Sequence, residues 1–187
     1  MACISKISAS FDYDCDSGAT GVVEALLIEK ADISGFSFES GSPASIDTIT
    51  VSGAVRLLDT PKRTLVLNSA LKVNEGAPNA FTHSGSLTVT AARTREYPFY
   101  AYFLDRIINP LANSSFVIIA RIMLPGGAIT SRIFGLYYGM SATGMDYSTH
   151  DNGGWTMVTF STPENVIGED TLVMTPAEYG RLKALAV

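Results

Sequence analysis

One amphipathic segment, flanked by two strand-like segments, constrains the fold of this chain more than any other feature. From Pro98 to Leu111, large apolar residues recur at spacings of one, three and four, as they do on one face of an α-helix. Pro98 suits the first helical turn, where its missing N–H has no partner, and Asn109–Pro110 disfavours helix near the other end. The pattern predicts a central helix at about residues 97–111, with one buried face.

The segments on either side of this helix have β-like patterns. Ser86–Ala91 alternates polar and apolar residues, and residues 116–124 are almost continuously apolar. A Pro-Gly-Gly turn follows, which predicts a long hairpin at about residues 115–139. Gly135 and Gly139 interrupt its second arm and indicate a bulge or a close backbone approach.

Several further segments are expected to be strands. Residues 21–30 are ambiguous between helix and strand, and their β-like neighbours favour strand. Residues 49–57 are typical of one half-buried strand, with residues 64–73 as its antiparallel partner. Residues 155–161 form another expected strand, whereas residues 74–85 and 140–154 have the composition of loops.

The C-terminal region carries a clear helix start. Thr175-Pro-Ala-Glu178 is a capping box with Pro at the first helical position, and it opens a short terminal helix. With 187 residues, the chain is long enough to bury a core of its own. We therefore expect a single β domain over residues 1–187, a β-sandwich or barrel with one central helix and one short C-terminal helix.

The charge balance argues against a protein that binds nucleic acid through its phosphates. The formal net charge is -5 with a pI near 4.9, and no Lys/Arg cluster occurs that could bind nucleic acid through its phosphates. Charged residues make up only 17% of the chain, which leaves a surface rich in Ser, Thr and Gly. Such a surface is common on β proteins covered by other subunits, although an isolated β domain can share it.

Cysteine usage and hydropathy suggest folding in the cytosol. The only cysteines are Cys3 and Cys15, and free thiols are a simpler interpretation than a single disulfide. The first residues lack the apolar core of a signal peptide, and no apolar run is long enough to cross a membrane.

An acidic run near the N-terminus has the spacing of the start of a calcium loop. Asp12, Asp14 and Asp16 alternate with other residues ahead of Gly18, but the twelfth position would be Val23, which cannot ligate a cation. A solvated acidic turn is therefore the favoured interpretation.

No motif in the chain carries catalytic chemistry. His83 and His150 both fall in expected loops, and no second motif supplies a nucleophile or converging ligands. A phosphate-binding glycine loop and a Gly-x-Ser-x-Gly elbow are absent. The sequence predicts no enzyme activity, catalytic residue, metal, cofactor or small-molecule substrate.

The order of elements and four segments resemble tail tube proteins of tailed bacteriophages. The resemblance covers about residues 45–165 and lies in Gly85–Thr90, in Phe134–Gly139 at the end of the hairpin, in the Ser/Gly/Asp-rich loop 140–154, and in the strand Trp155–Ser161. It implies a virion protein, made in the host bacterial cytoplasm, that forms stacked and usually hexameric rings. Hairpins of neighbouring subunits would join into a continuous β lining. Other tail proteins would be its partners, and DNA would pass an acidic lumen without specific binding.

The hairpin is the expected interface between subunits. Its first arm is apolar on both sides, so one sheet layer cannot cover it and partner subunits could. We predict that the interface includes residues of both arms: Val117, Ile119, Arg121, Met123, Arg132, Phe134, Tyr137 and Tyr138.

Two other interpretations stay open at this point. One is a carbohydrate- or cell-surface-binding β-sandwich, with Trp155, Tyr137, Tyr138 and the 140–154 loop as its site. The other is a different structural protein of a phage tail or capsid.

Overall fold

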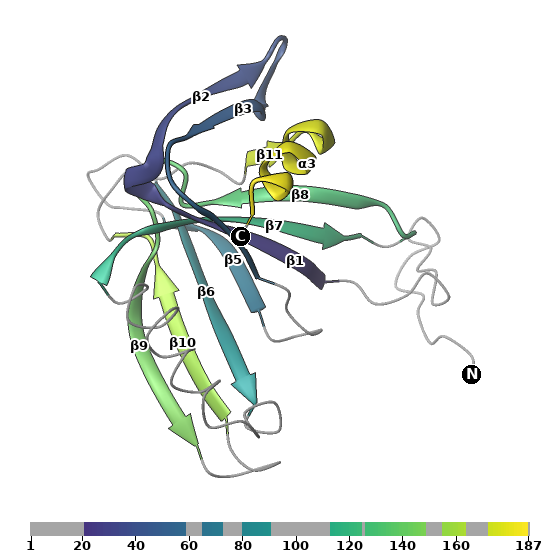
Figure 1. The fold of residues 1–187 in the computed structure, drawn as a ribbon. Coiled ribbons are helices and arrows are strands. Elements are labelled where there is room, and N and C mark those ends of the chain that lie inside the picture. Colours follow the sequence, from purple (N-terminus) through teal and green to yellow (C-terminus); the bar gives the residue numbers. More distant parts are fainter. Residues whose placement is uncertain are drawn as a thin grey trace, which may run out of the picture.

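A computed structural model describes residues 21–58, 65–72, 80–90, 113–124, 126–148, 155–163 and 172–186. The described chain is mainly β, with two sheets and a C-terminal helix (Figure 1). The elements are β1 (Gly21–Glu29), η1 (Lys30–Asp32), β2 (Ile33–Glu39), β3 (Ser42–Val51), β4 (Val55–Leu58), β5 (Leu65–Lys72), β6 (Ala80–Thr90), β7 (Phe116–Met123), β8 (Ile129–Phe134), β9 (Ser141–Ser148), β10 (Trp155–Ser161), β11 (Leu172–Met174) and α3 (Pro176–Ala184). The helix expected at about 97–111 lies outside the described residues.

The larger sheet has seven strands in the order β2-β3-β11-β8-β7-β1-β4. All of its pairs are antiparallel except β3 with β11, which run parallel. The smaller sheet has four antiparallel strands in the order β5-β6-β10-β9 and extends downward in Figure 1. Helix α3 packs against β3, β4 and β8, on the upper side of the larger sheet in that view.

The larger sheet has a separate hydrophobic core on each face. The core between the two sheets contains Ala25, Leu27, Leu65, Leu87, Phe116, Ile118, Ala120, Phe134, Met140, Val158 and Phe160. The core on the α3 side contains Leu26, Ile28, Ile33, Ile46, Ile49, Val55, Val117, Ile119, Ile133, Leu136, Leu172, Met174, Tyr179 and Leu182. Strand β7 lies between these cores, and that position explains its nearly continuous apolar sequence.

Several expected elements are confirmed. Residues 21–29 form a strand, and the β7–β8 hairpin closes where Leu124 N donates to Ala128 O at 2.7 Å. Helix α3 begins as the capping box predicts, because the Thr175 side chain accepts a hydrogen bond from Glu178 N at 3.3 Å.

The prediction of a single strand at residues 49–57 is wrong. The chain bends after Val51: Ser52 N donates to Asp32 O at 2.9 Å, and Gly53 lies against the Asp32 carboxylate, where any Cβ would be 1.8 Å from Oδ2. Strand β3 therefore ends there, and β4 pairs with β1. The expected partner, β5, pairs with β6 in the other sheet. Alternation of polar and apolar residues continues through the bend, so periodicity alone could not show it.

Two expected loops contain strands. Ala80–Gly85 belongs to β6 and pairs with β5, and Ser141–Ser148 forms β9 along one side of β10. Strand β9 has a loop-like composition because residues 143–146 are exposed. Conversely, the second arm of the hairpin ends at Phe134, since Gly135 and Gly139 both take a φ of +75° in the turn that follows.

Candidate assembly surfaces and the contacts that support them

The structure divides the expected interface residues between the inside and the outside of the folded chain. Val117 and Ile119 are fully buried in the core beneath α3, and Phe134 is buried in the core between the sheets. These three side chains pack within their own chain, so their assignment to an interface is corrected. The two-sided apolar pattern of β7 arises from burial on both faces within one chain.

The backbone of the β7–β8 hairpin is also paired within the chain. Strand β7 pairs with β1 on its outer side, and β8 pairs with β11 from Ser131 to Ile133. The hairpin is therefore at the centre of the sheet and not at an edge. The expectation that neighbouring subunits join through this hairpin does not fit such a topology.

The other expected interface residues are accessible but do not form one patch. The side chains of Arg121 and Arg132 point to opposite faces of the sheet. Arg121 is paired with Ser131, so these two share a face, and the next residue of β8, Arg132, points to the other face. Met123 ends β7 and is partly exposed. Tyr137 and Tyr138, in the turn before β9, are 45% and 44% exposed.

Tyr137 belongs to an aromatic cluster that the sequence did not identify as a site. Its ring is 5.4 Å from that of Phe36 on β2, edge to face, and Phe36 is in turn 5.7 Å from Phe38. Phe38 is 41% exposed. The alternation of Phe36 and Phe38 in the sequence was the available signal, but only the fold brings the turn residue beside them. Clustered, accessible aromatic rings are typical of the centre of a protein interface.

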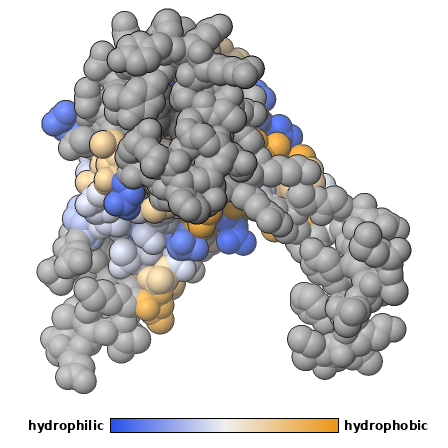
Figure 2. Space-filling view, turned by 90° about the horizontal axis from the view of Figure 1, so that it is seen from below, coloured by the Kyte–Doolittle hydropathy of each residue, from blue (hydrophilic) through white to orange (hydrophobic). Residues whose placement is uncertain are grey.

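The smaller sheet presents two outer strands. Among the described residues, no strand pairs with the outer edge of β5 or of β9. An exposed apolar side chain lies on each of them, Leu71 on β5 and Met145 on β9, which are 53% and 52% exposed. In Figure 2, which shows the molecule from below, orange hydrophobic patches lie beside blue hydrophilic ones on the described surface. Unpaired edges with apolar side chains are templates for pairing with another chain.

His83 fixes the relative position of the two sheets. It was expected in a surface loop, but it lies on β6 and is 1% exposed. Its Nδ1 accepts a hydrogen bond from Gly135 N at 2.9 Å, and its ring packs edge-on against Phe134 at 5.3 Å. On the main-chain side, His83 N donates to Thr162 Oγ1 at 3.1 Å. His83 therefore joins the smaller sheet to the end of β8 and has a structural role. His150 lies outside the described residues.

Two clusters of charged residues attach α3 to the larger sheet. Glu178 accepts from Ile49 N at 2.8 Å and from Arg181 at 2.6 and 2.7 Å, while Arg181 also donates to Ile49 O at 2.7 Å. The two side chains thus bond both backbone groups of Ile49, as a neighbouring strand would. Burial alone would raise the pKa of Glu178, but the bonds from Arg181 and Ile49 outweigh it and lower that pKa.

The second cluster centres on Glu24, near the Met123 end of β7. Lys183 Nζ is 2.6 Å from Oε2 of Glu24, and Arg121 Nη1 is 3.2 Å from Oε1. Burial would raise the pKa of Glu24, but these two cations hold it below its ordinary value. The Arg121 guanidinium is also 5.8 Å from the centre of the Tyr179 ring. Burial, with Glu24 nearby, raises the pKa of the Tyr179 hydroxyl.

Comparison of the chain with known protein families, curated proteins and solved structures yields no match. Within the part of the chain that the structure describes, no group of three or more His, Cys, Asp or Glu side chains could hold a metal ion. No helix in the same part is long and apolar enough to cross a membrane.

Proposed function

We propose that this protein is a structural subunit that assembles into rings, and that the rings stack into a tail tube like that of tailed bacteriophages. Its two facing sheets would form the β-sandwich of such a subunit. The assembly would be a hexameric ring in the virion, with DNA passing through it without specific binding and other tail proteins at its ends. It would have no enzyme activity and no cofactor.

The observation that carries this proposal is the geometry of the four-stranded sheet. Its strands alternate in direction and are even in number, so β5 and β9 run antiparallel to each other. A rotation that brings β9 of one subunit beside β5 of the next therefore continues the antiparallel alternation. Head-to-tail contacts of this kind close into a ring when the rotation divides a full turn. The ring would satisfy the backbone groups of both edges.

Other features agree with the same proposal. The aromatic cluster of Phe36, Phe38 and Tyr137 provides a second accessible surface, which could serve contacts between subunits or rings. The acidic balance of the chain, with a net charge of -5, would repel DNA phosphates from the walls of a conduit.

The carbohydrate-binding alternative requires Trp155, Tyr137 and Tyr138 to form one site, and their positions along β9 do not favour this. Tyr138 lies just before β9, whereas Trp155 pairs with Ser148 at the far end of that strand. An eight-residue strand is about 25 Å long, so these aromatic residues belong to opposite ends of the sheet. A single sugar site cannot include both.

The proposal is tested by the size and shape of the purified protein. We expect rings or tubes in negative-stain micrographs and a matching mass by light scattering. Met145→Lys adds a charge at the β9 edge and should leave a folded monomer, whereas Leu185→Lys is the matched control, because Leu185 is 51% exposed on another surface. A wild-type protein that stays monomeric and binds glycans would contradict the proposal, as would normal rings from Met145→Lys.

A further inference from the structure

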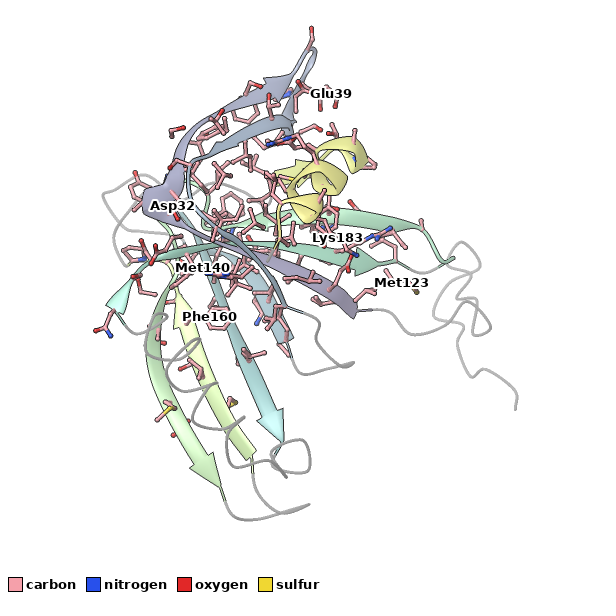
Figure 3. All side chains as sticks on the ribbon, in the orientation of Figure 1. Asp32, Glu39, Met123, Met140, Phe160 and Lys183 are labelled. Atoms are coloured by element: carbon pink, nitrogen blue, oxygen red, sulfur yellow. The ribbon has the colours of Figure 1, made fainter. Side chains whose placement is uncertain are left out.

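The two faces of the four-stranded sheet differ in their chemistry. The face toward the larger sheet is apolar, with side chains such as Leu87 and Val158 buried in the core between the sheets. Figure 3 labels two further residues of that core, Met140 and Phe160. Because strand residues alternate between faces, the register of the four strands places a second set of side chains on the opposite face. We call this the hydroxyl face, and its centre consists of Ser84, Ser86 and Thr88 of β6 with Thr159 and Ser161 of β10.

The hydroxyl face carries little charge. Its central side chains are partly exposed to solvent, and a solvated protein surface typically has a charged residue at about 25–35% of its positions. Among the described side chains of this face, Asp146 of β9 is the one ionisable group. Thr159 Oγ1 donates to Gly144 O at 3.3 Å and accepts from Thr143 Oγ1 at 3.3 Å. Part of the hydrogen-bonding capacity of the hydroxyls is therefore used within the sheet.

The apolar side of this sheet extends to both of its outer strands. Leu71 of β5 lies an even number of residues after the buried Leu65, so it shares the core face. Met145 of β9 pairs with the buried Val158 and shares that face too. Leu71 and Met145 are nevertheless 53% and 52% exposed. Bringing β9 of one copy beside β5 of the next would extend the apolar core across the junction, and the hydroxyl faces would join on the other side.

The layers of the fold decide which side of such a closed sheet faces the axis of the ring. The larger sheet covers the apolar face, and α3 packs on the far side of that larger sheet (Figure 1). The layer nearer the axis has the shorter circumference, so the four-stranded sheet fits there and the seven-stranded sheet with α3 fits outside. Six copies of the four-stranded sheet, with strands about 4.8 Å apart, close into a barrel about 37 Å across its backbone before any tilt.

We propose that the hydroxyl face lines the lumen of the ring and forms a wall along which a polyanion passes without ion pairing. This inference rests on the proposed function, because it takes the ring to be joined at β5 and β9. Proteins hold DNA mainly through Lys and Arg contacts to its phosphates, and the described side chains of this wall supply neither residue. Asp146 would repeat in every subunit as a ring of carboxylates and add repulsion.

Access of streptavidin to a biotin on this face tests the inference in the assembled protein. Ser86→Cys, in a Cys3→Ser, Cys15→Ser background, places a single thiol on the hydroxyl face and away from the outer strands. Leu185→Cys in the same background is the matched control, because Leu185 is 51% exposed at the end of α3. The assembled proteins are treated first with biotin-maleimide, which is small enough to enter the lumen, and then with streptavidin, a protein wider than the lumen.

Both kinds of tube should take up biotin, but only one should bind streptavidin along its length. Negative-stain micrographs should show streptavidin all along the Leu185→Cys tubes and a loss of it from the Ser86→Cys tubes, except at their ends. Adding Met145→Lys to Ser86→Cys gives the unassembled reference, which should bind streptavidin. Ser84→Cys, on the same face of β6, repeats the measurement at a second position.

The outcomes separate this inference from the proposed function. Streptavidin along the whole length of Ser86→Cys tubes would overturn the lumen assignment and leave the tube itself standing. A Ser86→Cys tube that takes up no biotin would also overturn it, because the face would then be covered by another subunit. So would an unassembled protein that excludes streptavidin, because its own chain would cover the face. If the wild-type protein forms no ring, the proposed function fails, and this inference fails with it.

Discussion

The imidazole of His83 accepts a hydrogen bond from the backbone N–H of Gly135 at 2.9 Å, across the boundary between the two sheets. The acceptor is Nδ1, so this nitrogen carries no proton in the folded protein. Gly135 takes a φ of +75°, and a Cβ there would be 2.7 Å from Met140 Cγ. A buried side chain of β6 and a turn after β8 thus fix each other.

Replacing this histidine by an apolar ring should weaken the joint between the sheets. His83→Phe keeps most of the ring volume and the contact with Phe134, but it leaves the buried N–H of Gly135 without its acceptor. We expect the free energy of unfolding to fall by about 1–3 kcal/mol, measured by urea denaturation. Asn68→Ala, exposed on β5, is the control and should change it by less than about 0.5 kcal/mol. A His83→Phe protein as stable as wild type would contradict this role.

Two glycines should respond to alanine in opposite ways. Gly85 of β6 lies between Leu67 and Phe160, and an added Cβ would be 2.4 Å from Val66 O and 2.7 Å from Phe160 Cε2. Gly85→Ala should therefore destabilise the protein by about 1–3 kcal/mol. Gly180→Ala meets no such atoms and should stabilise α3 by about 0.5–1 kcal/mol. Paired melting curves check this difference, and a shift of the same sign in both would refute it.

Acid should weaken the attachment of α3 before it affects the hydrophobic cores. The folded-state pKa values of Glu24 and Glu178 both lie below their ordinary value of 4.5. Their stabilisation is therefore fully present above pH 4.5 and is lost as the pH falls through the lower folded-state values. Unfolding free energies measured from pH 7 down to about pH 2 should decline in that window. The double variant Glu24→Gln, Glu178→Gln should decline less steeply, and an identical slope would contradict the assignment.

Ile119→Asp should unfold the protein itself, so it cannot test the proposed assembly. Ile119 is fully buried in the core beneath α3, so the new carboxylate would have no water and no cation. We expect a loss of about 4 kcal/mol or more, visible as lost β signal in circular dichroism. This residue is apolar and central to the hairpin in the sequence, but its burial makes Met145→Lys the informative assembly variant. A folded Ile119→Asp monomer would show that the site tolerates a charge.

Among the described residues, the sequence predicted two elements correctly where one local signal dominates. The capping box at Thr175 starts α3, and the glycine-rich turn after Leu124 closes the β7–β8 hairpin. Prediction from the sequence failed where the contact that determines the local structure comes from a distant part of the chain. The bend after Val51 depends on Asp32, and the strand character of Ser141–Ser148 depends on pairing with β10.

The candidate surfaces also depend partly on the sequence and partly on the tertiary structure. From the sequence alone, β7 is an apolar strand that must be covered on both faces, since apolar burial is a property of its side chains. Only the tertiary structure decided what covers it, namely α3 on one face and the four-stranded sheet on the other. The segments that cover β7 come from distant parts of the sequence. Hydrophobic periodicity shows which side chains of a strand are buried, but it does not show which segments pack against them. For this reason, among the described residues, the outer strands of the two sheets, β5 and β9 among them, have an edge open to a partner, whereas the hairpin does not.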